Sequence, residues 1–306
     1  MTKEPSLAVD IAGLLFSSPV IAASGTFGYG REYDDYLDLE KIGGFVTKGV
    51  SLEPRDGNQP PRIAETACGM LNAIGLANIG LEKFLADKLP LVEKTRARCV
   101  VNLYGESAEE FEKLAQALDA RQGVDALELN VSCPNVKGGG MAFGQDAKAV
   151  YELTRVVRQK TSLPLWVKLT PNVADPVPMA KAAADAGADA LSLINTILAM
   201  AIDARTRKPK LGNVYGGLSG PAIKPVGLRM VHQVSRAVDL PVVGMGGIMT
   251  GSDVAEYLLA GASAVQVGTA SFSDPASCVR IADELAAFMK EQGIAEVREL
   301  IGGLLS

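Results

Sequence analysis

Short runs of apolar and β-branched residues alternate along the chain with longer stretches in which apolar residues recur at helical spacing. This alternation is typical of repeated strand–helix units and a parallel sheet. The short runs predict strands at residues 20–23, 44–48, 99–103, 126–131, 165–169, 190–194, 242–245 and 264–268. The helical spacing predicts helices at residues 33–41, 81–94, 108–122, 146–160, 176–186, 226–238, 252–260 and 276–292. Eight strands alternating with eight helices predict an α/β fold, the (β/α)8 TIM barrel.

Two connections, 49–80 after strand 2 and 195–225 after strand 6, are longer than simple crossovers. Long connections in compact domains are usually functional, so we expect these two insertions to form walls of the site. The chain has 306 residues. Two average domains would fit that length, but α/β barrels commonly use ~250 residues or more as one domain. We expect residues 1–306 to form a single barrel domain.

Composition and charge narrow the possible partners. With 48% hydrophobic and 21% charged residues, the chain has enough apolar material for a large core. The net charge of −5 argues against a nucleic-acid-binding surface, which normally carries a basic excess. The longest uncharged stretch, 11–30, contains Pro19 and four glycines and suits a lipid-facing helix poorly. We therefore expect no nucleic-acid partner, no membrane span and no export or anchoring segment.

The cysteines and the single histidine exclude several kinds of site. The four cysteines never occur as C-x-x-C, so neither a disulfide framework nor a cysteine metal cage is indicated, and a reducing, cytoplasmic location fits. His232 lies inside a predicted helix, which excludes histidine-centred triads and paired-histidine metal sites. We expect no metal. We interpret Cys68, Cys99 and Cys278 as small buried apolar residues.

Polar residues and glycines gather where the predicted strands end. In a (β/α)8 barrel the chemistry lies at the carboxyl ends of the strands, where the loops converge. These positions hold Ser24, Gly25, Lys48, Gly49, Asn102, Asn130, Ser132, Cys133, Lys168, Asn195, Thr196, Gly246, Gly247, Gly268 and Thr269. The last two strands end in glycine-rich backbone, whose N–H groups suit a phosphate, although glycines also serve simple tight turns.

Cys133 is the strongest candidate for proton transfer. It follows strand 4 directly and precedes the glycine-rich stretch 137–144, which we expect to close over a substrate as a lid. A free thiol titrates near ~8.5, so a modest shift would make it a usable base near neutral pH. The alternative is an inert buried thiol.

Lys48 and Lys168 each end an otherwise apolar strand. A charge in such a position is costly unless an anion or dipole lies opposite. We therefore expect both lysines to bind an anion, and the alternative is that their side chains extend to solvent at the barrel rim.

Several motifs together resemble the dihydroorotate dehydrogenases. These motifs lie in order at residues 23–28, 47–51, 72–76, 130–135, 195–196, 216–220 and 244–248. The resemblance implies an FMN-containing barrel that oxidises (S)-dihydroorotate to orotate in pyrimidine biosynthesis. A cysteine at the position of the catalytic base resembles class 1 of this family. Class 2, which is membrane-bound, has serine there and an amphipathic extension before the barrel, neither of which we expect here.

Within class 1, residues 133–140 and 223–225 resemble the catalytic subunit of class 1B. That resemblance implies NAD⁺ as the final oxidant and a partner subunit that carries FAD and a [2Fe–2S] cluster, in a heterotetramer of two catalytic and two electron-transfer chains. The fumarate-reducing class 1A is the nearest alternative. A non-catalytic barrel that binds a phosphate ligand is the alternative from a different class.

The resemblance also implies a role for individual residues. Cys133 would take the C5 proton while hydride leaves C6 for FMN. Substrate would be bound by Lys48, Asn72, Ala73, Ile74, Gly75, Leu76, Asn130, Asn135, Asn195 and Thr196. FMN would be bound by Ser24, Lys48, Gly49, Asn102, Asn130, Lys168, Ile194, Gly220, Gly246, Gly247, Gly268 and Thr269.

Overall fold

A computed structural model describes residues 4–132 and 143–305, and its centre is a closed barrel of eight parallel strands. The barrel strands are β3 (Val20–Ala22), β4 (Gly44–Val46), β7 (Arg98–Leu103), β8 (Ala126–Asn130), β9 (Leu165–Lys168), β10 (Ala190–Leu193), β15 (Val242–Met245) and β16 (Ala264–Val267). They neighbour one another in chain order, and β16 pairs with β3 to close the ring. All eight predicted strands are confirmed, and so is the barrel.

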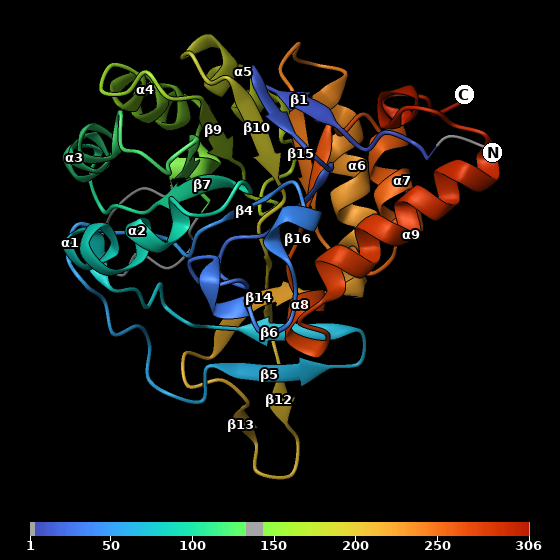
Figure 1. The fold of residues 1–306 in the computed structure, drawn as a ribbon. Helices are drawn as coiled ribbons and strands as arrows, with labels where there is room; N and C mark the ends of the chain where they lie inside the picture. Colours follow the sequence, from blue (N-terminus) through green and yellow to red (C-terminus); the bar gives the residue numbers. More distant parts are fainter. Residues whose placement is uncertain (1–3, 133–142, 306) are drawn as a thin grey trace.

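Helices connect successive strands on the outside of the barrel (Figure 1). They are α1 (Gly80–Lys83), α2 (Leu89–Val92), α3 (Ala108–Leu118), α4 (Ala147–Arg158), α5 (Val177–Asp185), α6 (Lys224–Ser235), α7 (Gly251–Leu259), α8 (Ala270–Ser273) and α9 (Ser277–Gln292). Helix α3 shows why they form: Ser107 caps its first turn, and Phe111 and Leu118 lie on a buried apolar face.

The predicted helix at 33–41 is wrong. The chain forms two short 3-10 turns there, Arg31–Tyr33 and Leu39–Lys41. Asp38 caps the second turn by accepting a hydrogen bond from the Glu40 N–H, a local bond that competes with a continuous helix. Tyr36 is 63% exposed, so the segment has no continuous apolar face to bury.

The predicted helix at 81–94 forms in two pieces. A π-helical turn, Phe84–Lys88, separates α1 from α2. Pro90 stands in the first turn of α2 and cannot donate a backbone hydrogen bond to the preceding turn. The proline therefore accounts for the change of helical register.

The two long connections fold together into one antiparallel sheet. Its strand order is β11 (Ile197–Met200), β14 (Tyr215–Ser219), β6 (Gly69–Asn72) and β5 (Ile63–Thr66). A small hairpin of β12 (Ile202–Asp203) and β13 (Lys208–Pro209) extends beyond it. The predicted insertions after the second and sixth barrel strands, β4 and β10, are confirmed. They pair through β6 and β14 and form one wall over the barrel.

The two ends of the barrel are covered differently (Figure 1). A hairpin of β1 (Val9–Ile11) and β2 (Leu14–Phe16) lies at the end opposite the inserted sheet, and the Phe16 ring packs against Trp166 with their centroids 5.9 Å apart. A 3-10 turn, Val297–Leu300, follows α9. Across the described parts of the chain, no helix combines the length and apolar character needed to cross a bilayer.

Candidate functional site

A cavity of about 440 Å³ opens between the carboxyl ends of the barrel strands and the inserted sheet. Strand ends form its floor, and β6, β14 and the loop after β6 form its wall. The predicted site residues that line it are Ser24, Lys48, Gly49, Asn72, Ile74, Gly75, Leu76, Asn102, Asn130, Lys168, Ile194, Asn195, Thr196, Gly220, Gly246, Gly247, Gly268 and Thr269. Segments almost 250 residues apart thus meet around one space.

Of the predicted site residues that the structure describes, only Ala73 does not line the cavity. Ala73 is buried in a small cluster with Leu71 and Leu211. Its neighbours Asn72 and Ile74 line the cavity, whereas Ala73 is absent from that lining. Cys133 and Asn135 lie outside the described residues, as does the lid segment up to residue 142.

A buried carboxylate, Glu128, lies inside the barrel beneath the cavity. Glu128 is 0% exposed. Its Oε1 accepts a hydrogen bond of 2.7 Å from Asn102 Nδ2, and Lys168 Nζ lies 3.6 Å away from the same oxygen. Its Oε2 accepts bonds of 2.7 Å from Ser192 Oγ and 2.8 Å from Gln266 Nε2. Side chains from four other barrel strands, β7, β9, β10 and β16, therefore direct donors at one anion.

Glu128 supplies the anion that the position of Lys168 predicts. Lys168 is 5% exposed, so the alternative that its side chain extends to solvent is wrong. Sequence reasoning missed Glu128 because it considered the strand ends and not the strand interiors. The available signal was one acidic residue within the apolar run 126–131.

Lys48 has a different environment on the cavity wall. Desolvation by burial, together with the positive charge of Arg62, holds the pKa of the Lys48 ammonium below its usual range, although the Glu32 carboxylate acts in the opposite direction. In residues 4–132 and 143–305, no carboxylate oxygen lies within ion-pair distance of Lys48. An anion entering the cavity would find this ammonium partly desolvated and without a competing ion pair.

Three polar side chains meet at the end of β8. Asn130 Oδ1 accepts bonds of 3.2 Å from the Ser132 N–H and 2.6 Å from Ser132 Oγ. Asn195 Nδ2 donates to Ser132 Oγ over 2.5 Å, and Asn195 Oδ1 accepts from the Thr196 N–H over 2.8 Å. Ser132 thus links two asparagines that line the cavity, one residue before Cys133.

The glycine-rich loop after β15 needs its glycines for geometry. Gly247 has φ +70°, and a Cβ there would lie 2.8 Å from Lys224 Cβ and 2.9 Å from the Gly220 carbonyl. At Gly268 the nearest atom to an added Cβ would be Ala23 Cβ at 3.5 Å, an ordinary contact. Protein packing therefore requires glycine at 247, whereas at 268 glycine leaves open space in the cavity.

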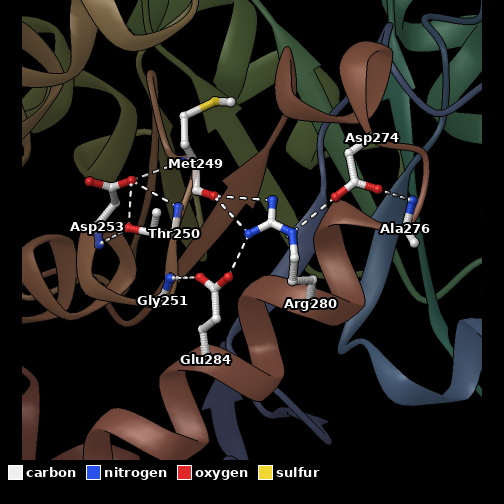
Figure 2. Close-up of polar contacts among 8 residues, drawn as sticks. All are labelled: Met249, Thr250, Gly251, Asp253, Asp274, Ala276, Arg280 and Glu284. Atoms are coloured by element: carbon white, nitrogen blue, oxygen red, sulfur yellow. Dashed lines mark hydrogen bonds and ion pairs between the residues drawn. The ribbon is translucent and has the colours of Figure 1, made fainter.

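A network of side chains binds the backbone of that loop (Figure 2). Arg280 donates two 3.3 Å bonds to the Met249 carbonyl and also binds the carboxylates of Asp274 and Glu284. Glu284 in turn accepts a 2.8 Å bond from the Gly251 N–H. The loop therefore has a fixed backbone before any ligand binds.

Asp253 also binds the backbone of the same loop. Its Oδ2 accepts bonds from the Met249 and Thr250 N–H groups at 2.8 and 2.9 Å, and Lys224 Nζ lies 2.6 Å from its Oδ1. Burial alone would raise the pKa of the Asp253 carboxyl, but these hydrogen bonds and the lysine charge outweigh burial and lower it below its usual range.

The three described cysteines do not all share one environment. Cys99 and Cys278 are buried as expected, and burial raises the pKa of the Cys278 thiol to about 11. Cys68 is exposed, so the expectation of a buried residue is wrong there. It lies in the tight turn between β5 and β6.

The chain is similar in sequence to known proteins over almost its whole length. Residues 6–289 match the family model described as dihydroorotate dehydrogenase. The chain is 56% identical over 303 residues to a protein of Geotalea uraniireducens, covering 99% of both chains, and 55% identical over 302 residues to one of Geobacter sulfurreducens, with the same coverage. Both relatives are named "Dihydroorotate dehydrogenase B (NAD(+)), catalytic subunit". The chain belongs to the dihydroorotate dehydrogenase family.

Proposed function

We propose that this chain is the catalytic subunit of an NAD⁺-linked dihydroorotate dehydrogenase, folded as a single domain over residues 1–306. It oxidises (S)-dihydroorotate to orotate in de novo pyrimidine biosynthesis, the route to UMP. The observation that carries the proposal is the shared cavity, in which Asn72, Asn130 and Asn195 lie with the glycine-rich strand ends. Amides that both donate and accept hydrogen bonds suit a ring of alternating N–H and carbonyl groups.

The cavity suits FMN as its flavin. Asn102 Oδ1 and Gln266 Oε1 are buried beside the cavity without a hydrogen-bond partner in the described chain, and polar atoms of this kind are normally satisfied. The glycine ends of β15 and β16 suit its phosphate. The residues we assign to FMN are Ser24, Lys48, Gly49, Asn102, Asn130, Lys168, Ile194, Gly220, Gly246, Gly247, Gly268 and Thr269. FMN, when bound, accepts the hydride that leaves C6 of dihydroorotate.

The residues of this chain perform the remaining tasks. Cys133, as thiolate, takes the proton from C5 of dihydroorotate, so that the substrate loses one proton and one hydride and becomes orotate. Lys48, residues 72–76, Asn130, Asn135, Asn195 and Thr196 bind and orient the substrate. Lys168 would help to hold the flavin, and its ammonium would stabilise negative charge there. Residues 137–144 close over the substrate and exclude water.

The electrons leave through a second subunit. We propose a partner that carries FAD and a [2Fe–2S] cluster and passes electrons to NAD⁺, in a cytoplasmic heterotetramer of two catalytic and two electron-transfer chains. The printed names of the relatives, which call each one a catalytic subunit and include NAD(+), support this assignment.

The test compares oxidants. The purified chain is loaded with FMN, mixed with dihydroorotate, and assayed for orotate with NAD⁺ or fumarate, with and without the co-expressed partner. We expect NAD⁺-dependent orotate formation that requires the partner. Turnover with fumarate by the isolated chain would contradict the NAD⁺ assignment, and a protein that stays colourless after FMN is added would instead support a non-catalytic barrel.

A further inference from the structure

Glu128 determines which polar atoms the floor of the cavity presents. Asn102 from β7 and Gln266 from β16 both line the cavity, and both direct their amide nitrogen at the Glu128 carboxylate. An amide that rotated by half a turn would place its oxygen against a carboxylate oxygen, which is repulsive. The carboxylate therefore fixes both amides with their nitrogens toward Glu128.

With its nitrogen fixed in this way, each amide has its oxygen directed away from Glu128. Asn102 Oδ1 and Gln266 Oε1 are fully buried and have no hydrogen-bond partner in the described chain. An unpaired buried acceptor destabilises a protein, so a ligand that donates a hydrogen bond to these atoms removes an unfavourable contribution. The floor thus contains two pre-oriented acceptors.

The same carboxylate also sets the charge of the floor. Glu128 Oε1 lies 3.6 Å from Lys168 Nζ, and both side chains are almost completely buried. At that distance the anion compensates part of the field that the ammonium directs into the cavity. Replacing the carboxylate with a neutral group of the same shape would leave the ammonium uncompensated.

We propose that Glu128 is a positioning residue for the flavin, on the basis of the FMN site proposed above. By orienting the amides of Asn102 and Gln266, it makes the floor selective for a ring that presents an N–H group, as the pyrimidine ring of FMN does at N3. By compensating Lys168, it keeps the reduction potential of the bound flavin lower than the lysine alone would set it.

The first measurement uses FMN and its N3-methyl analogue, which lacks the N–H donor. We expect the wild-type chain to bind FMN at least tenfold more tightly than the analogue, as measured by flavin fluorescence. In Glu128→Gln the new side chain has one N–H₂ group, so a facing amide must rotate and direct its own N–H₂ toward the cavity. We expect this variant to lose most of the preference for FMN over the analogue. A purely steric effect of the methyl group would instead give the same preference in the wild-type chain and in the variant.

The second measurement is the two-electron reduction potential of bound FMN. Loss of the compensating anion favours the reduced, more negative flavin, so Glu128→Gln should shift the potential in the positive direction. A tenfold change in the relative affinity for reduced and oxidised flavin corresponds to a shift of about 30 mV. A residue that only fills space in the barrel would leave the potential unchanged.

Two further variants separate positioning from packing. Ser192→Ala removes one hydrogen bond to Glu128 while leaving the carboxylate and both amides in place, and we expect it to keep the wild-type preference and potential. The exchange Asn102→Asp with Glu128→Gln restores one carboxylate and one amide across the same contact, and we expect it to recover the preference for FMN. This exchange also provides a test if Glu128→Gln alone fails to fold.

The outcomes are distinguishable. Equal binding of the two flavins by the wild-type chain, or wild-type discrimination and potential in Glu128→Gln, would overturn the role of Glu128 while leaving the proposed FMN site intact. Absence of binding of either flavin to the wild-type chain would overturn the proposed cofactor, and this inference with it.

Discussion

Individual side chains in this molecule are constrained by one buried charge cluster. Glu128 and Lys168 are both almost completely buried, Lys168 in the lining of the cavity and Glu128 beneath it. Removing one partner of a buried pair leaves an uncompensated charge, which is more destabilising than loss of a surface pair. The same two residues would therefore contribute both to stability and to the flavin site that we propose.

We expect Lys168→Met to lower the free energy of unfolding by about 3 kcal/mol because the Glu128 carboxylate loses its cation. FMN affinity should fall in the same variant. Chemical denaturation and flavin fluorescence measure the two effects. Lys148→Met is the matched control, since the Lys148 side chain is 80% exposed, and we expect a change within about 0.5 kcal/mol. Equal stability of the two variants would show that the buried pair is not important.

Cys133→Ala tests the assignment of the base. The variant should bind FMN normally, but dihydroorotate should bleach the flavin about 10²- to 10⁴-fold more slowly because the C5 proton has no acceptor. Stopped-flow absorbance measures the rate. Cys68→Ala, at the exposed β5–β6 turn, is the control and should react at the wild-type rate. Rapid bleaching in Cys133→Ala would remove this thiol from the mechanism.

At the level of elements, the loop between β15 and α7 is held in place by the protein itself. Arg280, Glu284 and Asp253 fix its backbone through the contacts described above (Figure 2). Gly247 lets the chain turn beside Lys224 with no room for a side chain. The N–H groups of Met249, Thr250 and Gly251 are used in these contacts, so the phosphate we propose would bind the N–H groups of Gly246 and Gly247 instead. Because the loop is rigid, that binding would need no further ordering of the backbone.

Gly247→Ala should destabilise the protein and weaken FMN binding, because the new Cβ meets backbone and Lys224 at a positive φ. Gly302→Ala is the matched control: Gly302 has the same φ of +70° but no neighbour within 4 Å. We expect the control to lose about 1–2 kcal/mol from conformation alone and to keep its FMN affinity. Equal effects of both substitutions on FMN binding would contradict a loop shaped for the phosphate.

The stabilisation that the Asp253 carboxylate gives to this loop depends on pH. Its pKa is lower in the folded chain than its ordinary value of 3.8. The stabilisation is therefore present above that ordinary pKa and is lost as the pH falls through the lower folded pKa. We expect Asp253→Asn to be less stable than the wild type near pH 6, and the difference in the free energy of unfolding to shrink toward pH 3. A constant difference over that range would exclude this linkage.

Different elements were predictable from the sequence to different degrees. The barrel strands are buried on both faces, so each one is an apolar run that its own residues identify. The inserted sheet pairs residues 70–72 with 217–219, and its strands are half exposed and rich in glycine. No local pattern marks such strands, because their pairing is determined by contacts between distant segments.

At the scale of the whole molecule, the barrel brings the site together from most of the chain. The strand-end rule was sufficient to find most of the polar residues on the cavity floor, since all parallel strands end at the same rim. It did not find the wall: Asn72 and Gly220 were predicted from the resemblance, and Met70 and Ser219 were not predicted. It was not sufficient to find Glu128 or Gln266, which lie within strands and act from below. Their roles depend on the closed barrel, which places β16 beside β3 and directs interior side chains toward a common centre.

The central claim is that this cavity holds a flavin which dihydroorotate reduces. The most direct measurement is anaerobic mixing of the FMN-loaded chain with (S)-dihydroorotate, monitored by flavin absorbance and by assay for orotate. The account predicts complete bleaching and one orotate formed for each flavin reduced. An FMN-loaded chain that keeps its colour and yields no orotate would contradict it.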